Sequence, residues 1–346
     1  MSAQLAYSTA SPGPSAGTPA PAPAGPRRAP KVEGRERIYR GGFAQVRTLL
    51  PDFTRVPFAF GASTVSNRNL DAIVRRFDPL QGLPAVPVGV VSRRYAMVTH
   101  REVLDAAQDA ITASGIDPAA IEVEAEVGEY GGRMALSALF PPEYAFDPGD
   151  GHALALRLIC VNSVDRSTRL RVALGWYRFV CGNGLLVGKT GSDVRETHRG
   201  GLSLAGVRKL VAGGLAGVES ERTVLRKWVG TPVDARALAE FADATLAQAW
   251  GAGAAARLWH IATTGRDCAM ACPGEDAPPH ARSVKALAAV PGSPQRARTA
   301  YDVSQALAWL AKQPGDPAER IERMAQIPQL VSALTGARCP AGALAR

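Results

Sequence analysis

Four consecutive segments between residues 121 and 181 have the apolar patterns of β-strands. In 121–127 (IEVEAEV), apolar residues alternate with three glutamates, which is the period-two pattern of a half-buried strand. The segment 134–140 also alternates and follows a Gly131-Gly132 turn, so the two segments predict a β-hairpin. Two more apolar runs, 152–162 and 168–181, are joined by the polar turn NSVDRST. These patterns predict an antiparallel sheet of about four or more strands.

Helical spacing occurs both before and after these four segments. A helix is predicted from about residue 100, because Thr99 and Glu102 match a capping box and Gly115 ends the pattern. After the sheet region, 86–190, apolar residues recur at helical spacing through a helical region, 200–336. The final two helices are predicted at Thr299–Lys312 and Pro317–Leu334. The fold class is therefore predicted as α+β, with an antiparallel sheet followed by a helical C-terminal half.

The patterns of helix and strand are weak or absent in the remaining segments. Residues 1–35 are rich in Ala, Pro, Ser and Gly and are predicted to be a disordered tail, which leaves a single domain over 36–346. Residues 36–82 contain several prolines and suggest a loop-rich entry layer, while 86–100 suggests two short strands. The segment 264–283 breaks the helical pattern and is expected to be a loop.

Composition limits the compartment and the partners. The chain has 346 residues, a hydrophobic fraction of 46% and a net charge of +9, which favours polyanionic partners such as nucleic acid. An Arg-rich composition that only maintains solubility explains the charge equally. The five scattered cysteines do not form a disulfide framework, and no apolar run spans a bilayer. We therefore expect a cytoplasmic protein with no membrane partner; the oligomeric state is left open.

The stretch FVCGNGLLVGKTGSD, 179–193, resembles the end of a phosphate-binding loop but fails its spacing. Counting back from Gly188, the first required glycine falls on Asn183. Leu185, Leu186 and Val187 are too bulky for a backbone cradle. We interpret the stretch as a strand end, a turn at Gly182-Asn183-Gly184 and a short second strand. The usual catalytic motifs are also absent, so the sequence favours a protein without enzymatic activity and predicts no catalytic residue.

One irregular stretch has candidate metal ligands. Imidazole and thiolate groups are the ligands that zinc prefers. The four residues are His260, Cys268, Cys272 and His280. Their H-x₇-C-x₃-C-x₇-H spacing does not match a standard zinc finger, so an ordinary loop is the competing interpretation. The sequence suggests no cofactor other than this zinc.

Positive charge is concentrated between Arg166 and Lys227. This strip has twelve Lys or Arg residues against four acidic ones, a net charge of +8, with Trp176, Tyr177 and Phe179 interleaved. Basic residues follow phosphates while aromatic rings stack on bases, as in single-strand binding. The candidate nucleic-acid contacts are Arg171, Arg178, Lys189, Arg195, His198, Arg199, Arg208 and Lys209. The alternative is that the aromatics are core residues and the arginines form the solvated face of a strand.

Several blocks together resemble a known family. They include EYGGRMALSALF, LALRLICVNSVDRSTRLRVALGWYRFVCGNGLLVG, THRGG and RTAYDVSQALAWLAKQ. They are similar to the phage/plasmid-like family catalogued as domain of unknown function 932, over roughly Arg94 to Lys312. The family-like positions are Arg157, Asn162, Ser163, Asp165, Ser167, Phe179, Val180, Cys181, Asn183, Gly184 and His198.

The resemblance implies a gene of prophages, plasmids and similar mobile elements, and it assigns no catalytic residue. The first functional hypothesis is a DNA-binding accessory protein in recombination, replication or defence, with single-stranded DNA favoured as partner. A sheet followed by helices with a basic strip is similar to the plan of phage single-strand annealing proteins, at the level of fold. The second is a protein-interaction or structural factor, and the third is a metal-dependent nuclease.

Overall fold

The computed structural model describes residues 37–59, 65–178, 183–185, 194–196 and 205–336. In it the four predicted strands form the centre of one seven-stranded antiparallel sheet. All of its pairs are antiparallel. In spatial order the strands are β1 (Arg37–Gly41), β5 (Glu122–Val127), β6 (Arg133–Leu139), β7 (Leu154–Ser163), β8 (Leu170–Arg178) and β10 (Val194–Glu196), with β9 (Asn183–Leu185) also paired to β8. The α+β fold and both predicted hairpins are confirmed.

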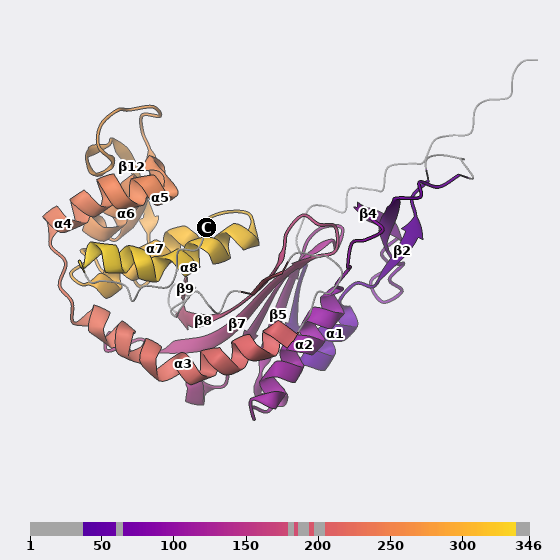
Figure 1. The fold of residues 1–346 in the computed structure, drawn as a ribbon. Helices are drawn as coiled ribbons and strands as arrows, with labels where there is room; N and C mark the ends of the chain where they lie inside the picture. The colour runs from indigo at the N-terminus through magenta and orange to yellow at the C-terminus, as the bar shows by residue number, and fades with distance from the viewer. Residues whose placement is uncertain (1–36, 60–64, 179–182, 186–193, 197–204, 337–346) are drawn as a thin grey trace, which may run out of the picture. The chain divides into compact units, whose positions relative to one another are not determined.

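Helices cover one face of this sheet. Helix α2 (His100–Ala113) and helix α3 (Ala205–Val229) pack against each other and against β7 and β8 (Figure 1). Helix α1 (Phe43–Leu49) contacts α2, β1 and β5. The predicted capping box is present at the start of α2, where the Glu102 amide donates to the Thr99 hydroxyl and the Thr99 amide donates to the Glu102 carboxylate. The cap fixes where α2 begins and therefore which of its residues face the sheet.

The C-terminal half is helical, as predicted. Its helices are α4 (Ala235–Glu240), α5 (Ala247–Trp250), α6 (Ala252–Thr264), α7 (Ala300–Ala311) and α8 (Pro317–Leu334), and a π-helical turn (Phe241–Leu246) joins α4 to α5. Short 3₁₀ turns lie at Pro118–Ala120, Pro142–Tyr144 and Pro279–Ala281. Helix α7 is buried along nearly its whole length and packs against α3, α6 and α8. None of the described helices combines the length and apolar character needed to cross a bilayer.

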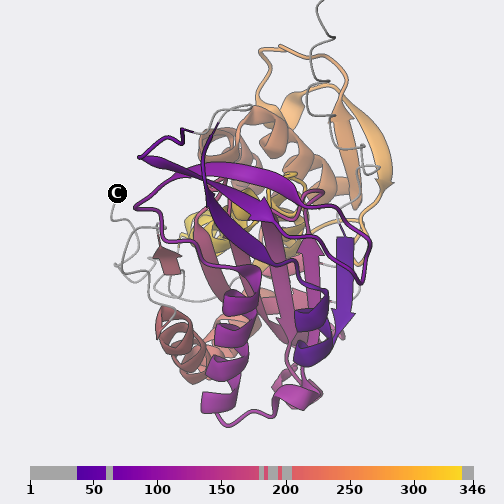
Figure 2. The same ribbon diagram turned by 90° about the vertical axis from the view of Figure 1, so that its right-hand side faces the viewer.

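The prediction of a loop-rich layer over 36–82 is wrong. Besides β1 and α1, the region contains β2 (Phe53–Pro57) and β3 (Leu70–Arg75), which form a three-stranded antiparallel sheet with β4 (Val86–Ser92) (Figure 2). The prolines misled the prediction because they lie at strand ends and in connections, where a missing amide costs nothing. The second short strand expected before residue 100 is also not formed, since a turn follows β4.

Two smaller predictions need correction. The expected loop over 264–283 contains β11 (Arg266–Met270), which pairs antiparallel with β12 (Val284–Ala289). The long connection between them has no tight-turn signal, so the hairpin could not be recognised from sequence. Of the turn expected at Gly182-Asn183-Gly184, the last two residues lie in a strand instead, because Asn183 pairs with Arg178 and Gly184 with Tyr177. Gly182 lies outside the described residues.

All elements named above belong to one compact unit, Gly34–Arg346. The predicted disordered tail, residues 1–35, lies outside the described residues.

Candidate functional site

Strand register gives the large sheet two different faces. Cross-strand partners such as Leu136 and Cys160, or Leu158 and Leu174, are buried on the face that packs against α2 and α3. Because side chains alternate along a strand, their neighbours project from the opposite face. This second face carries most of the polar residues of β5, β6, β7 and β8.

Helix α8 covers one row of the second face. The row joins Glu126, Ala135, Val161 and Arg171 across β5, β6, β7 and β8. The Arg171 guanidinium donates to the Ala318 carbonyl oxygen at 2.8 Å and pairs with Glu322, both from α8. Arg171 is therefore buried and neutralised, which explains its charge through packing and removes it from the candidate nucleic-acid contacts.

The neighbouring rows of the second face are not fully covered. We call these residues the open sheet face, and each of them is half-buried. They are Glu124, Ser137, Leu139, Arg157, Ile159 and Tyr177. They place two charged residues, Glu124 and Arg157, among polar, apolar and aromatic side chains on a rigid sheet, which is a common setting for a binding surface.

Arg157 has the most informative environment on the open sheet face. Its guanidinium carbon lies 4.4 Å from the centroid of the Tyr177 ring, a cation–π contact. Gly175 is the direct cross-strand partner of Arg157, so no side chain separates the guanidinium from the diagonal Tyr177. Sheet register thus places a cation on an aromatic ring.

The charge of Arg157 is only partly compensated. Burial lowers the pKa of Arg157, against smaller opposing effects of Tyr177 and Glu124. The Glu124 carboxylate is already paired with Arg40, at 2.6 Å. Within the described ranges no carboxylate forms an ion pair with Arg157. A half-buried guanidinium in this state favours an anionic ligand, because arginine cannot lose its proton to relieve the desolvation cost.

Of the other predicted nucleic-acid contacts, the structure describes the side chains of Arg178, Arg208 and Lys209. Arg178 is 5% exposed, pairs with Asp150 at 2.6 Å and donates to the Gly292 carbonyl, so it joins β8 to two loops. Arg208 and Lys209 are exposed on α3 and stay a prediction. Lys189, His198 and Arg199 lie outside the described residues. Arg195 belongs to β10, where it is paired in register with Arg171, and its side chain is not described.

The family-like Asn162 and its neighbour Ser163 form a buried polar network. The Asn162 amide donates to the Val98 carbonyl at 2.9 Å and to Nδ1 of His100 at 3.1 Å. Nε2 of His100 in turn donates to the Gly131 carbonyl at 2.8 Å. This arrangement requires the neutral Nε2–H tautomer. Asn162 and His100 are fully buried, so the network connects β7, the start of α2 and the β5–β6 turn.

Hydrogen bonds extend the network to Tyr95, which follows β4 in the chain. The Tyr95 hydroxyl donates to the Ser163 carbonyl at 3.2 Å, and the Ser163 hydroxyl donates to the Thr168 carbonyl at 2.8 Å. Burial lowers the pKa of His100 to about 4, so its ring stays neutral. The family-like segment therefore has a structural role. Of the other motif positions, Asn183 and Gly184 lie in β9, and Cys181 is outside the described residues.

The four candidate zinc ligands are not brought together. His280 is held by Asp243, which accepts from both its backbone amide and its Nδ1. Cys268 is buried in β11, whereas Cys272 is exposed. In the parts of the chain that the structure describes, which include all four residues, no three His, Cys, Asp or Glu side chains are arranged to hold a metal. The prediction of a zinc site at these residues is therefore not supported by their geometry.

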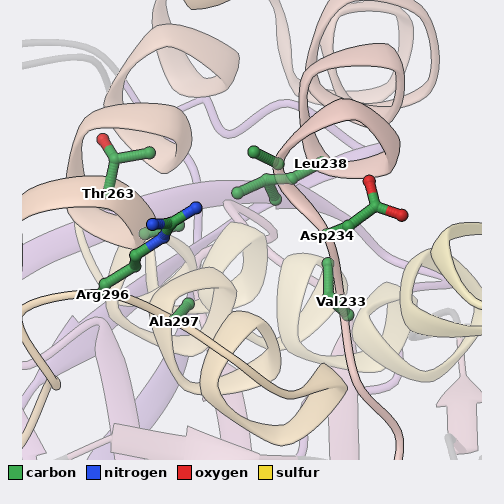
Figure 3. A pocket seen from close by; sticks show the side chains of 8 residues that line it. Val233, Asp234, Leu238, Thr263, Arg296 and Ala297 are labelled. Atoms are coloured by element: carbon green, nitrogen blue, oxygen red, sulfur yellow. The ribbon is translucent and has the colours of Figure 1, made fainter.

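A small pocket lies where α4 begins and α6 ends. Its volume of about 20 Å³ suits a single water molecule and is too small for a substrate. Asp234, Thr263 and Arg296 are among its lining residues (Figure 3). Asp234 also caps α4 by accepting from the Ala237 amide at 2.7 Å. We therefore assign this pocket to helix capping.

Comparison with known families agrees with the resemblance seen in the sequence. The model of the domain of unknown function DUF932 matches residues 87–308, which is well over half of the chain. The chain belongs to the DUF932 family. No curated protein and no solved structure matches it. The match begins in β4 and ends in α7, so the open sheet face of this DUF932 protein lies entirely within the family region.

Sequence reasoning named Arg157 only as a family-like position, not as a binding residue. A usable signal was present, because Arg157 is the one charged residue in the otherwise apolar run 153–161. Charged residues in such runs are rare unless a partner or ligand compensates them. Tyr177 was noted as an aromatic of the basic strip, and only the register shows that these two residues meet.

Proposed function

We propose that this DUF932 protein is a non-enzymatic factor that binds single-stranded nucleic acid, with DNA favoured, across the open sheet face. The observation that carries the proposal is the Arg157 guanidinium, which lies on the Tyr177 ring without a carboxylate partner in the described chain. The resemblance to phage and plasmid-like proteins supports a role as an accessory factor of a mobile element.

The chemistry of single strands fits this face. A partly desolvated guanidinium attracts phosphate oxygens and stacks on bases, and a neighbouring tyrosine offers a ring that accepts any base. Leu139 and Ile159 flank Arg157 with apolar surface, and Ser137 adds a hydroxyl. The +9 charge of the chain adds long-range attraction for a polyanion.

Replacing Arg157 with alanine is expected to weaken binding of a fluorescent single-stranded DNA about 10-fold, because a phosphate contact and a stacking surface are both lost. Tyr177→Ala is expected to have a similar effect. Fluorescence anisotropy at moderate salt measures the change. The matched control is Arg236→Ala, since Arg236 is an exposed arginine on α4 that pairs with Glu240. Equal affinities of the Arg157 and Arg236 variants would contradict the proposal.

The salt dependence gives a second measurement. Binding of the unmodified protein is expected to weaken as salt rises, because phosphate contacts release counterions. Arg157→Ala is expected to reduce the slope of log affinity against log salt concentration by about one unit. Absence of any salt slope in the unmodified protein would remove nucleic acid as the ligand.

A second candidate function is supported by the three-stranded sheet. Phe77 and Leu80 in the β3–β4 connection, and Val90 on β4, are large apolar side chains exposed to solvent. Exposed apolar clusters commonly mark contacts with other proteins. If the chain acts as a protein-interaction factor, Phe77→Ser with Leu80→Ser should abolish a nuclease-resistant complex that Arg157→Ala leaves intact.

A further inference from the structure

A second arginine in an unusual environment lies in the part of the chain that precedes the family match. Arg75 is the last residue of β3, where it is paired in register with Phe53 on β2 and Val86 on β4. It is only 2% exposed. Arginines buried to this extent normally have a carboxylate partner. Within the described residues, no ion pair involves Arg75.

The hydrogen bonds of Arg75 leave its charge uncompensated. Nη2 donates to the Pro84 carbonyl at 2.9 Å, and Nε is enclosed without a hydrogen-bond partner. The side-chain stem is close to Gly131, where an added Cβ would lie 3.2 Å from Cδ of Arg75. Packing against this glycine holds the side chain in place, so the guanidinium has little freedom to move toward bulk water.

A second positive charge acts on the same position. Burial is the main effect that lowers the pKa of Arg75, and the next is the charge of Arg37, the first residue of β1. Arg37 is half-buried, and its side chain has no ion pair among the residues that the structure describes. Strand pairing places the two residues near each other, because Arg37 is the register partner of Val127 and the turn that follows Val127 packs on Arg75 at Gly131. Two guanidinium groups placed in this way, both partly or fully removed from water, repel each other.

The nearby acidic and phenolic groups compensate these arginines only in part, because Asp78 brings one carboxylate to two guanidinium groups. Asp78 and Tyr39 act on the pKa of Arg75 in the opposite direction to Arg37, with smaller effect. The Asp78 carboxylate already accepts from the Leu80 amide at 2.9 Å and from Nε2 of Gln81 at 2.8 Å. The Tyr39 hydroxyl donates to Oε1 of Gln81, also at 2.8 Å. These groups hold the β3–β4 connection.

We propose that Arg37 and Arg75 form a binding site for a phosphate group, at the start of β1 and the end of β3. Guanidinium groups match the geometry of phosphate oxygens, and they cannot avoid the cost of burial by releasing a proton. A tetrahedral oxyanion supplies both the missing acceptors and the missing negative charge. The site precedes the matched residues 87–308 and does not depend on the proposed function of the open sheet face.

Thermal unfolding in sodium phosphate tests the site, with sodium chloride at equal ionic strength as the reference. Phosphate is expected to raise the midpoint of the unmodified protein saturably, by about 2 °C or more, because a ligand of the folded state stabilises it. Arg37→Gln is expected to lose most of this shift. Arg37 is the primary variant because it is half-buried, whereas changing the buried Arg75 risks the fold. Arg236→Gln is the matched control and should keep the full shift.

The outcome is decisive in both directions. A saturable shift that disappears in Arg37→Gln and persists in Arg236→Gln supports the site; an equal shift in both variants, or none in the unmodified protein, overturns it. A 5′-phosphorylated dinucleotide and its unphosphorylated form then distinguish the source. Competition by the phosphorylated form alone assigns the site to a terminal phosphate, and competition by neither assigns it to free phosphate. Arg157→Ala should keep the phosphate shift. A failure of the proposed function at the open sheet face can therefore be distinguished from a failure of the phosphate site.

Discussion

Replacing Asn162 with alanine is expected to lower the free energy of unfolding by about 3 kcal/mol. The substitution leaves the Val98 carbonyl and Nδ1 of His100 without their donor in a fully buried region, and it also opens a cavity. Urea unfolding followed by circular dichroism measures the change. The effect should be large because Asn162 connects the sheet to the start of α2.

The matched control for this prediction is Asn69→Ala. Asn69 is exposed before β3, so its replacement should change the free energy of unfolding by less than about 0.5 kcal/mol. A loss of less than about 1 kcal/mol in the free energy of unfolding of Asn162→Ala would show that the network does not hold the sheet to the start of α2.

The same network predicts sensitivity to acid. The pKa of His100 falls from its ordinary value of 6.5 to about 4 in the folded protein, mainly because of burial. A depressed histidine pKa contributes stability that is fully present above the unfolded value and is lost as the pH falls toward the folded value. Stability should therefore decline between pH 6.5 and 4, and less so in a His100→Gln variant. Parallel decline in both proteins would assign the acid sensitivity to other groups.

The second large effect concerns Glu221 on α3, and it appears as a loss of stability with rising pH. Oε2 of Glu221 accepts from the indole N–H of Trp176 at 3.0 Å. Burial raises the pKa of Glu221 to about 8, although the bond from Trp176 acts in the opposite direction. The adjacent Arg222 pairs with Glu219 rather than with Glu221. The carboxyl group is therefore largely protonated near neutral pH.

The sign of the effect follows from the direction of the pKa shift. A group whose folded pKa is raised contributes stability that is complete below its unfolded pKa, 4.5 here, and is lost as the pH rises through the folded value near 8. Glu221→Gln keeps an uncharged side chain of the same shape. It should abolish this loss and make the variant more stable than the unmodified protein at pH 9, by about 2 kcal/mol after allowance for partial exposure.

Chemical unfolding at pH 6 and pH 9 measures this difference. Glu219→Gln provides the control, because Glu219 lies two residues before Glu221 on α3 and 75% of its side chain is accessible to solvent. That variant should follow the pH dependence of the unmodified protein. If Glu221→Gln and Glu219→Gln behave alike, the Glu221 carboxyl is ionised in the folded state.

Local patterns predicted the strands and helices that have strong periodicity. The Glu-Val alternation of β5 and the Thr99–Glu102 cap are visible within a few residues, and both are formed. The patterns failed where pairing is non-local. Strand β1 is short and joins β5 across about eighty residues, and β12 finds β11 only across a long connection. Nothing inside such short segments encodes the partner.

The basic strip shows the limit of reading charge along a sequence. Arg171 and Arg178 are seven residues apart on β8, so alternation places them on opposite faces of the sheet. Each is then buried against its own carboxylate, Glu322 from α8 or Asp150 from the connection before β7. For these two arginines, the density of charge in the sequence therefore did not predict charge at the surface.

By itself the sequence determined the fold class, the order of sheet and helices, and membership of the DUF932 family. These depend on periodicity and on local motifs, which short segments contain in full. Only the tertiary structure decided which arginines are neutralised and which are not. Arg157 and Arg75 differ from Arg171 and Arg178 in their neighbours alone, and those neighbours come from strands and helices far away in the chain. Ion pairing is a short-range contact between side chains, so it is fixed when the elements pack.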